Sequence, residues 1–510
     1  PFFGKTKALA VWKEALSDEE LADLTYPTPT DPTFALDFDT IATDFTFARG
    51  SEATYVDAQG LIKSTNEIGE EEVINGDFAT DSDWNKASNV TIQDSSAIFT
   101  LAPSGQQLSQ SINPTIGKQY KIVYEIKSIT QGAFDVSVGS DISTSYNNSV
   151  GVYTEYLTAT STNAFYIRSR GTTNGSIDNV SVKEYTTETN TPRLDYSTGA
   201  EAFLLEPQST NLIPYSSDFN DASWYKGNTS VIADQEISPS GIQDADKVTF
   251  LAVPNANIQL ASAIATTIGE DYTYSIWAKA DTNVNNVKFG GGIGGDVDLA
   301  ITDNWQRFSV TFTATSTSTI TTLVTRNSVL SNIYLWGAQV EQQSYATSDI
   351  PTSGTTVTRN QETCINATPE INSEEGVLYA EIAALANDGA ANRISLSDGT
   401  SSNRLVIGYT ASNNIEAFFV VNGVNQAYIP FTIDITNNNK IAVSYKLNDF
   451  SLWVNGSKVG TDTSVSVPNI NTLNELQFRD SIGVPFFGNT KDLQVYTKAL
   501  SDAELIKLTT

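Results

Sequence analysis

The stretch KIAVSYKLNDFSLWVNGSKVG, from Lys440 to Gly460, decides the fold of the C-terminal part of the chain. Apolar and polar residues alternate through it, and turn residues interrupt the alternation. This pattern is typical of antiparallel β-strands joined by short turns. The neighbouring segments GVLYAEIAAL, NRLVIGYT, NIEAFFVVNG and LNELQFRD follow the same pattern. We therefore predict an antiparallel β-sandwich over residues 360–510.

The end of this predicted domain recurs at the start of the chain. GNTKDLQVYT predicts a last strand, and Ser501 with Glu504 forms a capping box that predicts one short helix. The stretch from Pro485 to Thr509 is about two thirds identical to the first 25 residues, where Ser17 and Glu20 repeat the box. We expect residues 1–26 to end a preceding domain of the same kind, within a tandem architecture. The alternative is an independent β-α hairpin whose similarity is coincidental.

Two further modules resemble each other between these ends, at residues 71–186 and 209–345. VINGDFATDSDWNKASNVTI in the first resembles LIPYSSDFNDASWYKGNTSVI in the second, and IGKQYKIVYEIK likewise matches IGEDYTYSIWAK. Both modules show many short strands and no long helical pattern, which predicts jelly-roll sandwiches. The predicted fold class is all-β, with tandem antiparallel sandwiches of jelly-roll and concanavalin A-like type and only short capping helices.

Three connecting segments separate the predicted domains, at residues 27–70, 187–208 and 346–359. In the second connector, YSTGAEAFLLEP places a glycine turn between two potential strands. The third connector, within DIPTSGTTVTRNQET, is an extended linker by composition.

The connectors carry the most specific resemblance. FARGSEATYVDAQGLIK, TPRLDYSTGAEAFLLEPQSTNLIPYSSDFNDASW and DIPTSGTTVTR resemble segments of phage and prophage tail-fibre and virion appendage proteins. In that family the first two phrases run nearly together, so the module at 71–186 is interpreted as an inserted recognition or spacer domain. The two middle modules resemble carbohydrate-binding modules of the galactose-binding-like jelly-roll kind. FSLWVNGSKVG and FFGNTKDLQVYTKALSDAEL resemble laminin-G-like, concanavalin A-like lectin domains.

The resemblance implies a non-enzymatic fibre or appendage protein at a virion surface, or otherwise outside the cell. Its expected partners are a host-surface glycan and other virion proteins or copies of itself, in a homo-oligomer. Two alternatives stay open. One is a purely architectural decoration protein of a capsid or tail. The other is a secreted bacterial adhesin or the accessory glycan-binding region of a polysaccharide-degrading enzyme.

Composition excludes several classes of function. The 510 residues carry a net charge of −30, which disfavours nucleic acid and anionic lipid as partners. No apolar run of about 18 residues occurs, so no membrane insertion is expected. The chain has no His and one Cys, Cys364, which removes His-dependent catalysis and His-ligated metals. The Glu-x-Asp-x-x-Glu pattern of the concanavalin A-like glycosidases is absent, so we predict no enzyme.

Aromatic residues are the candidates for a glycan site, because sugars stack on exposed aromatic faces. Tyr272 and Tyr274 share one face of a predicted strand and Trp277 points to the other, so either face is a potential platform. Four tryptophans recur at family-like places in their modules, which favours core packing: Trp84, Trp224, Trp305 and Trp453.

A calcium ion is the one cofactor that the resemblance suggests. Jelly rolls of this type often hold a structural calcium between the first strand and the last, where Asp77 and Asp178 lie in the first module. Two acids do not complete a calcium site, and surface or turn-capping roles are the alternative. In the second module Asp218 matches the first acid and Tyr334 replaces the second.

Overall fold

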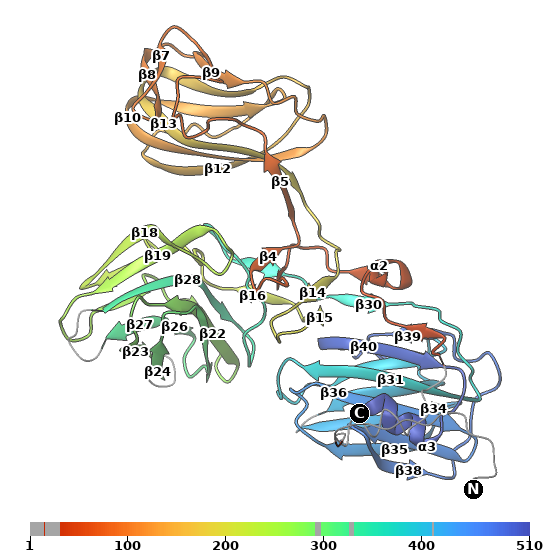
Figure 1. The fold of residues 1–510 in the computed structure, drawn as a ribbon. Coiled ribbons are helices and arrows are strands. Elements are labelled where there is room, and N and C mark those ends of the chain that lie inside the picture. Colours follow the sequence, from red (N-terminus) through yellow and green to blue (C-terminus); the bar gives the residue numbers. More distant parts are fainter. Residues whose placement is uncertain (1–14, 16–30, 291–296, 326–330, 411–412) are drawn as a thin grey trace. The chain divides into compact units, whose positions relative to one another are not determined.

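The computed structural model describes residues 15, 31–290, 297–325, 331–410 and 413–510. Within them, regular structure is almost entirely antiparallel strand, with two short helices, α2 (Ile41–Asp44) and α3 (Asp502–Thr509) (Figure 1). This confirms the predicted all-β class. Neither of these helices is long and apolar enough to cross a membrane. The domain end predicted over residues 1–26 lies, except for Ala15, outside the described residues.

The chain divides into two compact units, one of residues 64–188 and one of residues 1–63 with 189–510. We call the first the inserted unit, because the second resumes after it. The inserted unit is one nine-stranded sheet folded over its own core. Its strands are β5 (Glu67–Glu71), β6 (Asn85–Lys86), β7 (Val90–Gln93), β8 (Ser96–Ala102), β9 (Gln107–Gln110), β10 (Gln119–Val138), β11 (Asp141–Ile142), β12 (Gly151–Thr158) and β13 (Phe165–Thr186).

The long strands β10 and β13 pair with each other over most of their length. Both strands contribute to both layers of the inserted unit. Their pairing shifts register at four places, and such bulges bend a strand and let it pass from one layer to the other. Alternate side chains then face the core, where Phe99, Phe134 and Ile167 are without solvent contact.

The second sandwich consists of two five-stranded sheets, ordered β18-β19-β28-β22-β25 and β17-β20-β27-β23-β24, with a small pair β21-β26. Its core holds Phe250, Ile276 and Leu335. The strands are β17 (Trp224–Gly227), β18 (Thr229–Ile237), β19 (Gln243–Phe250), β20 (Asn257–Leu260), β21 (Ile264–Ala265), β22 (Asp271–Lys279), β23 (Val284–Gly290), β24 (Val297–Ile301), β25 (Gln306–Thr313), β26 (Ser318–Thr319), β27 (Thr322–Thr325) and β28 (Ser331–Glu341).

The inserted unit and the second sandwich repeat the same internal contacts. The indole N–H of Trp84 donates to the carbonyl of Asn75, and that of Trp224 donates to the carbonyl of Tyr215, both at 2.9 Å and both nine residues back. Both rings are buried, as is Trp453, which confirms the prediction of core packing for these three. Trp305 is only partly buried.

The C-terminal sandwich packs an eight-stranded sheet against a five-stranded one, ordered β35-β34-β33-β32-β39, around a core that includes Leu405, Phe419 and Val443. The five-stranded sheet contains β32 (Asn392–Ser397), β33 (Arg404–Thr410), β34 (Asn414–Val421), β35 (Val424–Thr432) and β39 (Glu475–Gln477). The larger sheet contains β1 (Phe34–Ala35), β14 (Arg193–Asp195), β15 (Ala202–Leu205), β31 (Glu375–Ala384), β36 (Asn439–Lys446), β37 (Asp449–Val454), β38 (Ser457–Asp462) and β40 (Gly488–Tyr496).

Helix α3 ends this domain as the sequence predicts. The Glu504 backbone N–H donates to the Ser501 hydroxyl at 3.4 Å, and the Glu504 carboxylate accepts from the Ser501 backbone N–H at 2.8 Å. Leu505 packs with Trp453 and Tyr496 on the eight-stranded sheet. The capping box is thereby confirmed.

The connectors are packed segments whose strands pair within one connector or with the residues that flank another. β2 (Thr46–Ala48) pairs with β30 (Thr363–Ile365), β16 (Ser209–Asn211) pairs with β29 (Val357–Arg359), and β3 (Thr54–Val56) forms a hairpin with β4 (Ile62–Ser64). The predicted glycine turn is confirmed, since β14 and β15 form a hairpin around Gly199, whose φ is +83°. This hairpin extends the eight-stranded sheet, because β15 pairs with β40.

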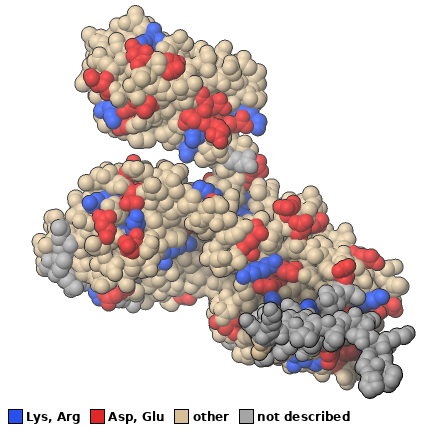
Figure 2. Space-filling view, in the orientation of Figure 1, with Lys and Arg blue, Asp and Glu red and all other residues tan. Residues whose placement is uncertain are grey.

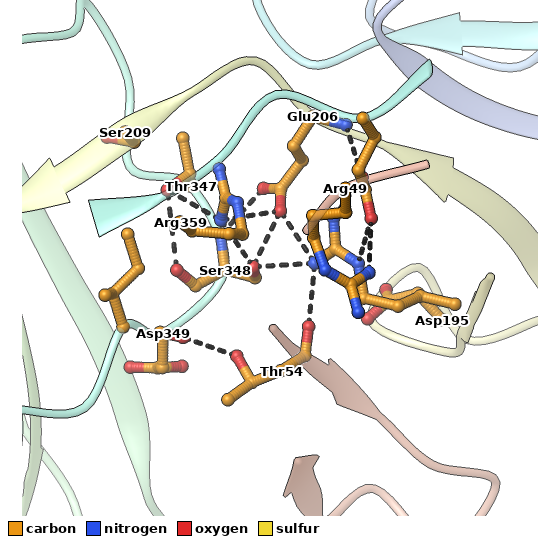
Figure 3. Close-up of polar contacts among 12 residues, drawn as sticks. Arg49, Thr54, Asp195, Glu206, Ser209, Thr347, Ser348, Asp349 and Arg359 are labelled. Carbon is orange, nitrogen blue, oxygen red and sulfur yellow. Dashed lines mark hydrogen bonds and ion pairs between the residues drawn. The ribbon is translucent and has the colours of Figure 1, made fainter. Parts of the chain in front are cut away.

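A buried network of charges joins the three connectors (Figure 3). The Arg193 guanidinium donates to both oxygens of Glu362, at 2.9 and 2.5 Å, and Arg49 donates to the same carboxylate at 2.8 Å. Arg359 and Arg193 both lie 2.8 Å from Oε2 of Glu206. We call these five residues the arginine network.

Ser348 lies at the centre of this network. Its hydroxyl donates to Glu206 at 2.6 Å and accepts from Arg193 and Arg359, each at 2.8 Å. Burial alone would raise the pKa of Glu206, but the two arginines and the hydrogen bonds from Ser348 lower it to about 2. The network therefore keeps Glu206 charged, and it gives both buried carboxylates bonded arginine partners, as buried charges require.

Candidate functional site

The outer face of the five-stranded sheet in the C-terminal sandwich gathers aromatic and charged side chains. Side chains alternate along a strand, so Ile407 and Phe419 point into the core, and Val406 and Phe418 point outward. Phe418 pairs across the sheet with Val406 on one side and Tyr428 on the other. We call this surface the outer sheet face.

Two arginines cover Phe418. The guanidinium carbons of Arg393 and Arg404 lie 5.2 and 5.4 Å from the centre of its ring, within the range of cation–π attraction. Gly408 makes room for Arg393, since a Cβ at that glycine would lie 2.9 Å from the Arg393 side chain and 2.5 Å from the Asn392 carbonyl. Phe418 is consequently 7% exposed and forms the floor of the face.

Two carboxylates hold Arg393 in place. Arg393 donates to Glu416 and to Asp480, both at 2.8 Å. Asp480 is fixed in turn by the loop after β39, because its other oxygen accepts from the backbone N–H groups of Ile482 and Val484 at 3.1 and 3.0 Å. Residues 87 positions apart in the chain thus meet on one face.

The electrostatics of this group follow from its burial. Burial raises the pKa of Glu416, and the attraction of Arg393 only partly opposes that effect. Burial alone would lower the pKa of Arg393, but its bonds to Asp480 and Glu416 raise it. Arg393 therefore stays charged, and both carboxylates are committed to it.

Arg404 has unused hydrogen-bonding capacity. Its closest carboxylate is that of Asp480, with Nη1 and Oδ2 3.8 Å apart, which is too long for a hydrogen bond. Nε and Nη1 of Arg404 have no hydrogen-bond partner among the described residues and little contact with solvent. An acceptor brought to this guanidinium would gain bonds that the chain itself does not supply.

Tyr428 provides an open aromatic surface next to Phe418 and is 52% exposed. At the opposite edge of the sheet, Glu475 on β39 lines a groove of about 410 Å³. The groove is lined by Thr368, Pro369, Glu370, Ile371, Asn471, Leu473, Asn474 and Glu475. The outer sheet face thus carries an exposed aromatic ring beside buried charge pairs, and the groove lies at the far edge of the same sheet.

The structure corrects the glycan prediction for Tyr272 and Tyr274, which are 2% and 1% exposed in the core of the second sandwich. The Tyr272 hydroxyl accepts from the backbone N–H of Thr267 at 2.9 Å, as that of Tyr120 does from Thr115 in the inserted unit. Tyr272 is one of the residues that line a groove of about 410 Å³, but it is almost without solvent contact. Neither ring offers a face on which a sugar could stack.

Trp277 points to the opposite face of its strand, as predicted, but a connector covers it. It packs with Ile62 and Trp336 in a cluster that the β3–β4 hairpin closes. Its indole N–H lies 3.2 Å from a carboxylate oxygen of Asp349. Trp277 therefore serves the packing of the hairpin, and the prediction of a sugar platform is wrong for it as well.

The two acids of the calcium prediction do not fit a calcium ion. Oδ2 of Asp178 lies 3.5 Å from the Lys127 ammonium, which already supplies a cation. Asp77 accepts from the backbone N–H of Ala79 at 3.3 Å, a turn-capping role. Among the described residues no three acidic or cysteine side chains gather as metal ligands. The turn-capping alternative fits Asp77 better.

Figure 2 shows the charged side chains on one face of the molecule. On the face drawn in Figure 2, acidic and basic groups lie among larger uncharged areas. The acidic groups on this face agree with the net charge of −30.

Residues 378–506 match the family model of the concanavalin A-like lectin/glucanases superfamily. The C-terminal sandwich is therefore a concanavalin A-like, laminin G-like domain, as its sequence indicates. The match includes the strands β32 to β35 and β39 that form the outer sheet face. A comparison with curated proteins gave no match.

Several solved structures resemble parts of the chain. CBM40 of the Ruminococcus gnavus IT-sialidase, bound to α2,3-sialyllactose, is 17% identical, covers 27% of this chain and 83% of its own, and has a TM-score of 0.24. The CBM22-1–CBM22-2 tandem of Paenibacillus barcinonensis Xyn10C is 11% identical over 55% and 98%, with a TM-score of 0.20. Domain 4 of the Geobacillus stearothermophilus arabinanase AbnA, with arabinotriose, is 11% identical over 61% and 100%, with a TM-score of 0.18.

Proposed function

We propose that the chain binds glycans at the outer sheet face without cleaving them. The observation that carries this proposal is the exposed ring of Tyr428 on the same face as Arg404, whose Nε and Nη1 have no hydrogen-bond partner among the described residues. The face lies in a domain of the lectin/glucanase superfamily.

The chemistry of this face suits a sugar. The apolar side of a pyranose ring stacks on an aromatic ring, which Tyr428 offers. Sugar hydroxyls accept hydrogen bonds from a guanidinium and donate to carboxylates, amides and other hydroxyls. Arg404 supplies the donors, and the groove at Glu475 supplies an acceptor with two asparagines beside it. Placed polar groups of this kind fix the orientation of a bound ligand.

The absence of bond cleavage is part of the proposal. A glycosidase needs one carboxyl group that releases a proton and a second that is free to act as base or nucleophile. Glu416 and Asp480 are the two buried carboxylates beside Phe418, and both are bonded to Arg393. Their bonds suit a structural role that fixes the arginine.

The biological setting is proposed from the resemblance of the connectors. A fibre or appendage of a phage virion would display these sandwiches outside the cell and attach to a host-surface glycan. Copies of the chain in a homo-oligomer, together with other virion proteins, would repeat the weak site. Linking weak sites raises overall avidity by about 10²–10⁴-fold without new contacts.

A glycan array with the full chain tests the proposal, followed by calorimetric titration of the tightest glycan. Tyr428→Ala and Arg404→Gln should each weaken binding tenfold or more. Tyr225→Ala is the matched control, because Tyr225 is 54% exposed but lies on the second sandwich, and it should bind as the wild type does.

Other outcomes favour other functions. An array without any binding would favour the architectural alternative. Shortened products after incubation with the bound glycan would show an enzyme. Equal binding by all three variants would place the glycan site elsewhere in the chain.

A further inference from the structure

The inserted unit carries a second group of charged and aromatic side chains, on the outer face of one of its layers. Asp135 on β10 pairs across the sheet with Arg168 on β13, and the neighbouring pairs are Ser137 with Tyr166 and Ala133 with Arg170. Because side chains alternate, these groups face away from the core residues Phe134 and Ile167.

One carboxylate serves two arginines at this place. Asp135 is without solvent contact and accepts from Nε of Arg168 at 3.1 Å and from Nε of Arg170 at 2.6 Å. Neither arginine forms an ion pair with another carboxylate among the described residues. One positive charge is thus uncompensated in the group, within a chain whose net charge is −30.

The two guanidinium groups also keep unused donors. Nη2 of Arg168 is buried and has no hydrogen-bond partner in the described part of the chain. Arg170 keeps 31% of its side chain exposed, whereas Arg168 keeps 14%. Arg170 is therefore the more accessible of the two arginines to a ligand from solvent.

Tyr146 adds an aromatic surface beside the exposed arginine. The guanidinium carbon of Arg170 lies 5.3 Å from the centre of the Tyr146 ring, which is 60% exposed. The adjacent Asn147 fixes the loop, since it exchanges two backbone hydrogen bonds of 2.9 Å with Phe134 and donates to the Tyr124 hydroxyl at 2.7 Å. The carboxylate of Glu155 is directed to Asn147, at 3.5 Å.

We propose that Arg168, Arg170 and Tyr146 bind an acidic sugar, that is, a sugar residue bearing a carboxylate. A guanidinium presents paired donors that match a carboxylate, and the uncompensated charge favours an anion over a neutral hydroxyl. The Tyr146 ring accommodates the apolar side of the sugar ring. This site belongs to a different unit from the outer sheet face and goes beyond the function proposed for that face.

Calorimetric titration of the full chain with two acidic probes and their neutral counterparts tests the site. One probe is trigalacturonic acid, and its neutral counterpart is its carboxyl-reduced form. The other probe is 3′-sialyllactose, and its neutral counterpart is lactose. The two pairs test uronic and sialic acids separately. At least one acidic probe should bind tenfold or more tighter than its neutral counterpart. Binding should weaken as salt concentration rises.

Variants locate the binding. Arg170→Gln and Tyr146→Ala should each weaken the acidic probe tenfold or more. Lys127→Gln removes the same charge from the same unit, outside the group, and should leave the affinity unchanged. Tyr146→Ala removes only a largely exposed ring, so its effect does not depend on the fold surviving the loss of an arginine.

Three results would overturn the inference. The first is that neither acidic probe binds, and the second is that Lys127→Gln weakens binding as much as Arg170→Gln does. The third is that Tyr428→Ala abolishes acidic-probe binding while Arg170→Gln does not. That third result would move the ligand to the outer sheet face and leave the proposed function standing.

Discussion

At the scale of single residues, buried charges in this chain depend on bonded partners. Arg193, Glu206 and Glu362 are almost without solvent contact, and each is bonded to at least one charge of opposite sign. Removal of one member leaves another buried and unpaired, and that costs more than the intact pair contributes. The arginine network is therefore the place where single substitutions should destabilise most.

Glu206→Gln should lower the stability of the chain by about 3–5 kcal/mol, because Arg193 and Arg359 lose a buried counter-charge. The measurement is the shift of the denaturant unfolding transition. Lys446→Gln is the control, since it breaks the exposed pair with Asp449 and should cost no more than about 1 kcal/mol. Equal shifts in the two variants would refute the role of the network.

Stability should also depend on pH through Glu206. Its pKa in the folded chain is about 2, below the ordinary value of about 4.3. The stabilisation is therefore complete above about pH 4.5 and is lost as the pH falls toward 2. Melting temperatures measured over this range should fall more steeply for the wild type than for Glu206→Gln; parallel curves would contradict the assignment.

Tyr272 shows how far sequence alone leads at this scale. It aligns with Tyr120 in the repeated words IGKQYKIVYEIK and IGEDYTYSIWAK, and that recurrence was the available sign of a shared core role. No comparable recurrence in the sequence marks Tyr428 as exposed, because its exposure follows from its place on β35. Trp277 faces outward as alternation predicts, yet the hairpin that covers it lies more than 200 residues earlier.

At the scale of elements, the sequence predicts the strands and the helix cap. It does not predict which polar side chains meet on the outer face of a sheet. NRLVIGYT and NIEAFFVVNG are the strands β33 and β34, and Ser501 caps α3 as expected. The pair of Arg393 and Asp480 depends on cross-strand register and on a loop 87 residues further along. Outward polar positions in these strands were the only signal in the sequence.

Ser501→Ala should destabilise α3 by about 1 kcal/mol, because the first turn loses an acceptor for the Glu504 backbone N–H. Amide hydrogen exchange in residues 502–509 should accelerate, while exchange in β40 stays unchanged. Ser457→Ala, an exposed serine on β38, is the control. No acceleration in the helix would show that its packing against Trp453 suffices.

At the scale of the whole chain, the connectors on either side of the inserted unit bind each other. The backbone N–H of Gly50 donates to the Thr189 carbonyl at 3.1 Å, and that of Tyr196 donates to the Val56 carbonyl at 2.9 Å. The segments FARGSEATYVD and TPRLDYSTGAEAFLLEP are thus in contact in the structure. The sequence indicated an insertion here, and these contacts give the physical reason why the flanking segments can fold together.

Replacement of residues 64–188 by a short flexible linker should leave the remaining chain folded, because the arginine network and both remaining cores lie outside the deletion. The melting transition of the C-terminal sandwich should persist, as should glycan binding at the outer sheet face. Binding of the acidic probes should disappear. Aggregation of the shortened chain would contradict the independence of the units.

The measurement that tests the central claim most directly is a hydrogen-exchange footprint of the full chain with and without the tightest glycan from the array. The account predicts slower exchange in peptides from β33 to β35, residues 404–432, with the second sandwich unchanged. Protection confined to the second sandwich, or no protection anywhere at saturating glycan, would contradict it.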